Sequence, residues 1–112
     1  MIWEYKTLKV SELTPATYNP REISKDEFEG LKNSLKTFGF ADPAVVNSNN
    51  SVIVGGHQRV KAWEALGNKE VPCMLAPLTE EQEKKLNVLL NSQAISGKYD
   101  DLMLSELLEG MK

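Results

Sequence analysis

The clearest pattern of apolar and polar positions lies between residues 25 and 38. Apolar side chains recur there at the three- and four-residue spacing of one helix face: Phe28, Leu31, Leu35 and Phe38. Ser24 and Glu27 have the spacing of a capping box, in which each side chain bonds the other residue's backbone N–H. Gly39 then ends the run. The pattern predicts a helix over residues 25–38.

Shorter apolar runs predict the strands of a small sheet. Residues 6–10 alternate between polar and apolar, and residues 71–75 form a second short run. Residues 43–46 and 51–54 are separated by Asn-Ser-Asn-Asn, whose asparagines tolerate left-handed backbone conformations, so these two runs predict a hairpin. Residues 11–22 hold two prolines and several side chains that favour turns, and we expect a loop there.

Two further helices are predicted from the same helical spacing. Within residues 56–66 the large apolar side chains share one side, and Gly67 follows as a terminator. At the end of the chain four apolar residues keep the i, i+3, i+4, i+7 spacing of an amphipathic helix: Leu104, Leu107, Leu108 and Met111. This stripe could cover the domain's own core or meet a second copy of the chain, so a homodimer is a possible state.

A second capping box marks another helix between these two. Thr79 and Gln82 have the required spacing, and the apolar pattern continues to about Asn91, after which residues 92–99 favour a loop. Three acidic residues occupy the first turn: Glu80, Glu81 and Glu83. We expect them to complement the positive end of the helix dipole, without a catalytic role.

The order of elements predicts a single α+β domain, with a small mixed β-sheet flanked by helices and a C-terminal amphipathic helix. A chain of 112 residues has room for one core, so residues 1–100 and 101–112 are expected to form one compact unit. The net charge of −3 argues against a surface built throughout for the phosphate backbone of a nucleic acid, although a local basic patch stays open.

The cysteine and histidine counts exclude some chemistry. Cys73 is the only cysteine, so an internal disulfide is impossible, and with one histidine besides it a structural zinc site is excluded in practice. No stretch has the length and hydropathy of a signal peptide or a membrane span. We therefore expect a cytoplasmic protein that does not engage a membrane.

The candidate chemistry lies where the strand ending at Val54 meets the next helix. Gly55 and Gly56 would let an anion approach the backbone closely, and the first turn of a helix presents N–H groups and a positive dipole end to it. Arg59 adds a planar fork of donors that suits phosphate oxygens, and His57 a donor whose charge depends on pH. We include Gln58 in this phosphate-binding set. The alternative is a tight turn whose glycines only permit packing.

The same residues resemble a known family. Gly56, Arg59 and Ala62 reproduce the G-x-x-R-x-x-A box of the ParB N-terminal domain, and Asn19-Pro20-Arg21 resembles its upstream Asn-Pro…Arg segment. The similarity spans roughly residues 6–100. It implies the fold that this domain shares with sulfiredoxin and a free-serine kinase, and it implies a bound nucleoside triphosphate (CTP or ATP) with Mg²⁺ at the arginine box.

The resemblance also implies roles for individual residues. Asn19 would belong to the nucleotide-binding set, and Arg21 would close over the phosphates. Asn91 stands in a stretch similar to the family's E-N-x-Q-R segment, without its acid and its arginine, and would help to position Mg²⁺. Because that carboxylate is missing, Glu22 is the candidate catalytic residue for orienting water. Sulfiredoxin's catalytic cysteine is replaced here by His57, and Cys73 is expected on a buried strand, which argues against sulfinic acid reduction.

The whole pattern looks most like the ParB-like domains of phages and prophages. The leading hypothesis is a nucleotide-binding domain in a DNA-related process, with DNA or a DNA-processing protein as partner. One alternative is a metal-dependent nuclease, for which acidic residues would have to cluster around a divalent ion; the candidates are Glu22, Asp100 and Asp101. Another is a non-catalytic interaction module, associated with a DNA methyltransferase in some relatives of this kind.

Overall fold

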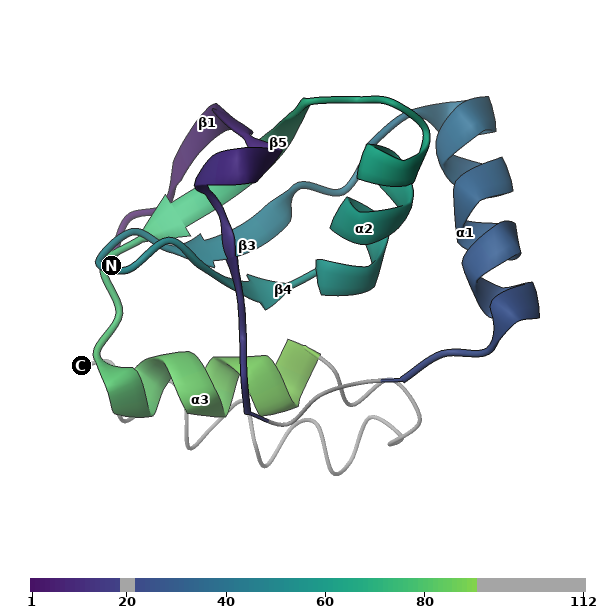
Figure 1. Ribbon diagram of the computed structural model, residues 1–112. Coiled ribbons are helices and arrows are strands. Elements are labelled where there is room, and N and C mark those ends of the chain that lie inside the picture. The colour runs from purple at the N-terminus through teal and green to yellow at the C-terminus, as the bar shows by residue number, and fades with distance from the viewer. Residues whose placement is uncertain (19–21, 91–112) are drawn as a thin grey trace.

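The computed structural model describes residues 1–18 and 22–90. Within them the chain forms one five-stranded sheet and three α-helices (Figure 1). The elements, in chain order, are β1 (Glu4–Lys9), the 3₁₀ turn η1 (Val10–Glu12), β2 (Thr14–Pro15), α1 (Lys25–Phe38), β3 (Ala44–Asn47), β4 (Val52–Gly55), α2 (His57–Ala65), β5 (Glu70–Ala76) and α3 (Glu80–Leu90). The predicted α+β class is confirmed, while the expected loop at 92–99 and the C-terminal helix lie outside the described residues.

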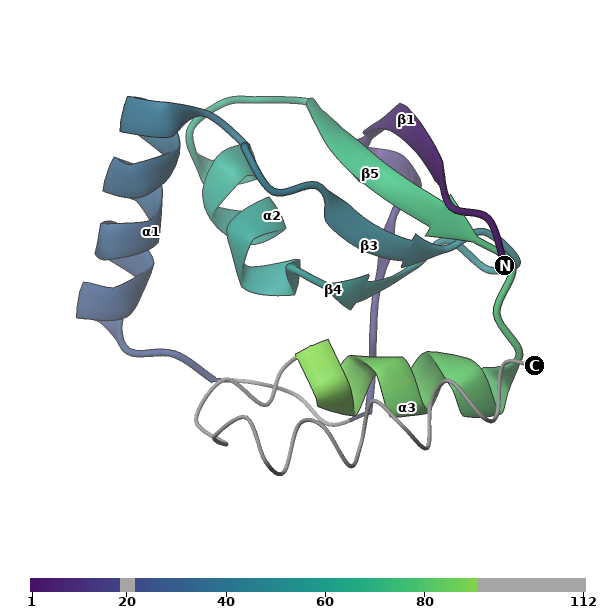
Figure 2. The same ribbon diagram turned by 180° about the vertical axis from the view of Figure 1, so that it is seen from behind.

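The sheet is mixed, with strand order β1-β5-β3-β4-β2. β3 pairs antiparallel with β4 through the predicted hairpin and parallel with β5, and β1 covers the other edge of β5 in antiparallel register. Figures 1 and 2 show α2 on one side of the sheet and α3 on the other, with α1 standing outside α2. Both faces of the central strands are therefore covered.

The hydrophobic core has two parts, one on each face of the sheet. Successive residues of β4 supply both, because neighbouring side chains of a strand point to opposite faces. Ile53 joins the larger cluster with Val60 of α2, and Val54 joins the smaller one with Leu86 of α3. Burying a side chain of this size stabilises the fold by about 1.5–3 kcal/mol. β4 thus holds both helices at fixed positions relative to its own C-terminal end.

Both predicted capping boxes are present. The Ser24 hydroxyl accepts from the backbone N–H of Glu27 at 3.1 Å while the Glu27 carboxylate accepts in return, and α1 has the predicted bounds. Thr79 and Gln82 make the same reciprocal pair at the start of α3. The local start signals were therefore sufficient to place two helices.

The segment expected to be a loop contains some regular structure. Residues 10–12 form η1, and β2 pairs in parallel with the start of β4, Thr14 opposite Val52. Two residues are too few to show alternation, and a proline is compatible with an edge strand because its missing N–H would face away from the sheet. This pairing exists only because the hairpin presents a free edge.

The acidic first turn of α3 is not uniform. Glu80 and Glu81 are exposed and pair with lysines one turn later. Glu83 is only 3% exposed, and its carboxylate accepts hydrogen bonds from three side chains: Tyr18, Asn47 and Asn50. Glu83 therefore belongs to the interior, where it ties α3 to the β3–β4 hairpin.

The longest helix in the described part is α1, at 14 residues, and none there has the length and hydropathy needed to cross a membrane.

Candidate nucleotide-binding site

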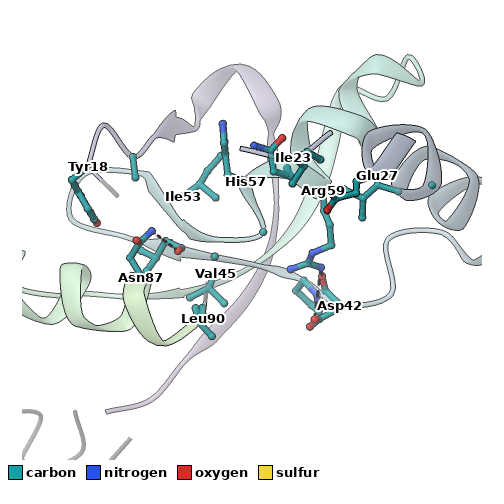
Figure 3. Close-up of a pocket in the computed structure, with 18 residues that line it drawn as sticks. Tyr18, Ile23, Glu27, Asp42, Val45, Ile53, His57, Arg59, Asn87 and Leu90 are labelled. Carbon is teal, nitrogen blue, oxygen red and sulfur yellow. Dashed lines mark hydrogen bonds and ion pairs between the residues drawn. The ribbon is translucent and has the colours of Figure 1, made fainter. Parts of the chain in front are cut away.

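A cleft of about 620 Å³ lies at the point where β4 passes into α2. Its walls come from α1, β3, β4, α2 and α3 as well as from the loop before α1, and Figure 3 shows the side chains that face it. Its lining mixes polar side chains, such as those of Arg59 and Asp42, with apolar ones, such as those of Ile23 and Val45. Clefts of this size and mixed lining are typical of small-molecule sites.

Gly55 lacks a side chain for a packing reason. A Cβ atom built there would lie 2.6 Å from Leu90 Cδ1, so the end of α3 occupies the space that the missing side chain leaves. Gly55 is also buried and has no positive φ. For this glycine the structure supports the packing alternative.

Gly56 differs in both respects. Its φ of +89° is left-handed, a conformation that L side chains rarely adopt, and it caps the N-terminus of α2 without a side-chain hydrogen bond. A Cβ atom at Gly56 would lie 2.6 Å from Arg59 Nη2, so the guanidinium lies directly against this turn. The cation and the positive end of the α2 dipole thus meet at one point, which defines an anion-binding geometry.

Arg59 is held in place by the loop between α1 and β3. Its Nη1 donates to the backbone carbonyl of Asp42 and lies 3.7 Å from the Asp42 carboxylate, and the guanidinium stacks over Phe40 at 5.3 Å from the ring centroid. The Arg59 side chain is 26% exposed and that of Asp42 is 88% exposed. Asp42 can therefore give up the ion pair to another anion at little cost, because exposed pairs contribute about 0–1 kcal/mol.

His57 lines the cleft with a partly buried imidazole. Burial lowers its pKa below the usual value, and the positive charge of Lys61 one turn later lowers it further. Its Nδ1 is buried without a hydrogen-bond partner among the described residues. His57 is therefore neutral at pH 7 and can offer one ring N–H to a ligand but no positive charge.

The remaining candidates fall into two groups. Asn19, Arg21 and Asn91 lie outside the described residues. Gln58 lines the cleft, whereas Glu22 is exposed and is not among the lining residues. The structure therefore gathers five of the predicted residues at one place: Gly55, Gly56, His57, Gln58 and Arg59.

Sequence reasoning missed several residues of the cleft. Among the described residues, the carboxylates that line it are those of Glu27 in α1 and Asp42. Asn87 of α3 also lines it, is 4% exposed and donates from Nδ2 to the Val54 carbonyl at 3.0 Å. A polar residue in the middle of the apolar face of α3, four residues before Asn91, was a signal that could have revealed it.

The described residues contain no group of three His, Cys, Asp or Glu side chains that could hold a metal ion. Cys73 is fully buried, as expected, and burial raises the pKa of its thiol to about 11. It is therefore no reactive thiolate.

Comparisons with known proteins identify the family of this chain. A family model described as the ParB N-terminal domain matches residues 3–92, so the chain belongs to the ParB N-terminal domain family. The ParB-like nuclease domain-containing protein YnaK of Escherichia coli is 35% identical over 77 residues, which cover 68% of this chain and 87% of YnaK. The chain spans only about a third of the length of the chromosome-partitioning proteins ParB that it matches.

Solved structures confirm the fold. The C-terminally truncated chromosome-partitioning protein ParB of Caulobacter crescentus, in complex with CTP-gamma-S, superposes with a TM-score of 0.72 at 23% identity, covering 83% of this chain and 55% of that one. Sulfiredoxin of Arabidopsis thaliana superposes with a TM-score of 0.63 at 18% identity, covering 74% of this chain and 96% of that one. The predicted ParB/sulfiredoxin-like fold is therefore confirmed.

Proposed function

We propose that this chain binds a nucleoside triphosphate in the cleft and acts in a DNA-related process. The observation that carries the proposal is the guanidinium of Arg59 lying against Gly56 at the N-terminus of α2. Its fork of donors and the first-turn N–H groups face the same space, which suits several phosphate oxygens at once. The ParB structure solved with CTP-gamma-S has this fold, which supports CTP as the first nucleotide to test and ATP as the second.

In this proposal the phosphates displace the Asp42 carboxylate from Arg59. His57 donates a neutral N–H, and Gln58 and the backbone at Gly55 and Gly56 complete the cradle. Asn19 and Arg21 are proposed to close over the phosphates from the segment that follows Tyr18. The apolar side chains of the lining would contact the base or the sugar.

Mg²⁺ fits as a companion of the triphosphate. It usually keeps several waters and takes one or two protein oxygens besides phosphate oxygens. Glu27 and Asp42 line the cleft and can supply such oxygens, and Asn91 is proposed as a further ligand. The ion would neutralise phosphate charge. Glu22 is proposed as the water-orienting residue. Its side chain is exposed and is not among those that line the cleft.

Thermal unfolding with CTP or ATP, each with and without Mg²⁺, tests the proposal. A ligand present at about 100 times its dissociation constant should raise the stability of the wild type by about 2.7 kcal/mol. Arg59→Ala should lose most of this shift because the phosphates lose their bidentate partner. Lys69→Ala removes the same charge from an exposed position that does not line the cleft and should respond like the wild type. No shift for the wild type at millimolar nucleotide would refute the proposal.

The relatives of this chain suggest its biological setting. One solved ParB structure is complexed to a centromeric parS site, and YnaK is named for a ParB-like nuclease domain. We therefore propose DNA or a DNA-processing protein as partner, homodimerisation as a further state, and a phage or other mobile element as the origin.

The name of YnaK also makes metal-dependent nuclease activity the second candidate. Of the acidic residues expected for it, Glu22 is exposed and does not line the cleft, and Asp100 and Asp101 lie outside the described residues. Nicking of supercoiled plasmid in Mg²⁺ or Mn²⁺ would establish this activity. If neither nucleotide binding nor nicking is observed, an interaction module associated with a DNA methyltransferase becomes the leading function.

A further inference from the structure

Tyr18 is a wall residue of the cleft whose position is not set by any helix or strand. It lies between the end of β2 at Pro15 and the start of α1 at Lys25. Tyr18 lines the cleft (Figure 3). It also lines a second hollow beside the β3–β4 turn. A side chain on such a connection samples several positions unless a contact from elsewhere in the fold holds it.

Glu83 of α3 supplies that contact. The Tyr18 hydroxyl donates to Glu83 Oε2 at 2.5 Å, across 65 residues of sequence. The ammonium of Lys84 lies 5.7 Å from the Tyr18 ring centroid, over its face. The phenol is therefore held by a charged acceptor at its tip and by a cation against its ring, both from the first turns of α3.

Glu83 is itself held on its other side. Asn47 and Asn50 of the β3–β4 hairpin each donate from Nδ2 to Glu83 Oε1 at 2.8 Å. The amide oxygen of Asn47 accepts from the backbone N–H groups of Asn49 and Leu78, so the amide cannot rotate without losing these bonds. The Oε2 atom of Glu83 is thus aimed at Tyr18 by a rigid turn.

The charge states agree with this arrangement. Burial raises the pKa of Glu83, but hydrogen bonds from Tyr18, Asn47 and Asn50 outweigh it, and the pKa lies below its ordinary value. Burial and the Glu83 carboxylate raise the pKa of Tyr18 well above its ordinary value. At neutral pH the pair is a carboxylate and a phenol, which matches one acceptor with one donor.

We infer that Glu83 is a positioning residue of the nucleotide site, acting through Tyr18. Glu83 neither lines the cleft nor touches a ligand there; it fixes the ring of Tyr18 in the wall before a nucleotide arrives. Fixing one side chain in advance saves the entropy of ordering it on binding, which corresponds to about a three- to tenfold gain in affinity. The inference rests on the proposed function, since it concerns the affinity of the same cleft.

A double-mutant cycle tests the inference. Tyr18→Phe keeps the ring and removes the donor, and Glu83→Gln keeps the shape and the oxygen that the two asparagines bind. The dissociation constants of CTP and of ATP with Mg²⁺ are measured by calorimetry well below the unfolding temperature. Each variant should bind about three to ten times more weakly than the wild type, and the double variant no more weakly than Glu83→Gln alone.

Two controls separate positioning from folding. Tyr5→Phe makes the same change on the exposed edge strand β1, at a residue that lines neither hollow, and should leave the affinity unchanged. Asn49→Ala removes a hydrogen bond to the Leu78 carbonyl at 3.0 Å without touching Tyr18 or Glu83, so it should lower the unfolding midpoint and spare the affinity. Amide exchange at residues 16–18 of the free protein should accelerate in Tyr18→Phe, with α2 unchanged.

The outcomes distinguish the two proposals. If the wild type binds nucleotide and Tyr18→Phe binds equally well, the positioning role is wrong while the proposed function stands. Independent losses that add in the double variant would also overturn the role. If the wild type binds neither nucleotide, the proposed function fails and the inference fails with it.

Discussion

Gly55 and Gly56 are adjacent, and the structure gives each a different reason to lack a side chain. At Gly55 the space is filled by Leu90 of α3, and at Gly56 a left-handed turn brings Arg59 against the backbone. A Gly-Gly pair in a sequence therefore carries two independent constraints, of which one concerns stability and the other the anion site.

Gly55→Ala should destabilise the fold by about 1–3 kcal/mol, because the new methyl group overpacks against Leu90. Chemical denaturation measures the loss. Leu90→Ala opens the same space, so the double variant should be less destabilised than the sum of the two single variants. Gly30→Ala is the matched control: nothing lies within 4 Å of its added Cβ, and the helix should gain about 0.5–1 kcal/mol. A loss of nucleotide affinity in Gly55→Ala at unchanged stability would mean that the missing side chain at Gly55 serves the ligand and not the packing of Leu90.

At the scale of elements, local start signals and distant contacts act on the same helices. α1 begins at a capping box, yet its only buried residue is Leu35, and it packs on α2 outside the sheet. A helix with so little buried surface depends more on its ends than one enclosed by the core does.

Ser24→Ala should therefore destabilise the protein by about 1 kcal/mol, since the N–H of Glu27 loses its acceptor. Thr37→Ala is a suitable comparison in the same helix: its hydroxyl donates to the Asn33 carbonyl, which already serves the helix, and its removal should cost little. Urea unfolding followed by circular dichroism measures both changes. Equal effects of the two substitutions would mean that the cap does not limit the stability of α1.

At the scale of the whole molecule, the Glu83 network joins the hairpin, α3 and the segment before α1. These parts are far apart in sequence and meet at one buried carboxylate. Acid should therefore weaken the whole fold through this group.

Because the pKa of Glu83 is lowered in the folded state, its contribution is fully present above the ordinary value of about 4.5 and is lost as the pH falls below it. The stability of the wild type should fall more steeply than that of Glu83→Gln as the pH drops below about 4.5. The lowered pKa of His57 also makes the stability fall as the pH drops below its ordinary value of 6.5. His57 is present in both proteins, so its effect cancels in this comparison. Urea unfolding at a series of pH values measures the difference, and parallel curves would exclude Glu83 as the titrating group.

The sequence by itself determined the elements whose causes are local. Two capping boxes, an asparagine-rich hairpin turn and a 3.6-residue period require only neighbouring residues, and they placed α1, α3, β3 and β4 correctly. The Gly-Gly-His-Gln-Arg run also indicated the turn where the cleft lies, because a strand that leads directly into a helix forms an anion site from adjacent residues.

Tertiary structure alone decided what depends on residues far apart in the chain. Leu90 of α3 fills the space beside Gly55, so that no side chain fits there. Asp42 and Phe40 hold the guanidinium of Arg59, and Asn87 lines the cleft from α3. The burial of Glu83 was not predicted, because a carboxylate in a helix's first turn normally stays in water. The hairpin asparagines and Tyr18 supply the hydrogen bonds that stabilise its charge inside the fold. These donors are far from Glu83 in sequence, so no local pattern predicts them.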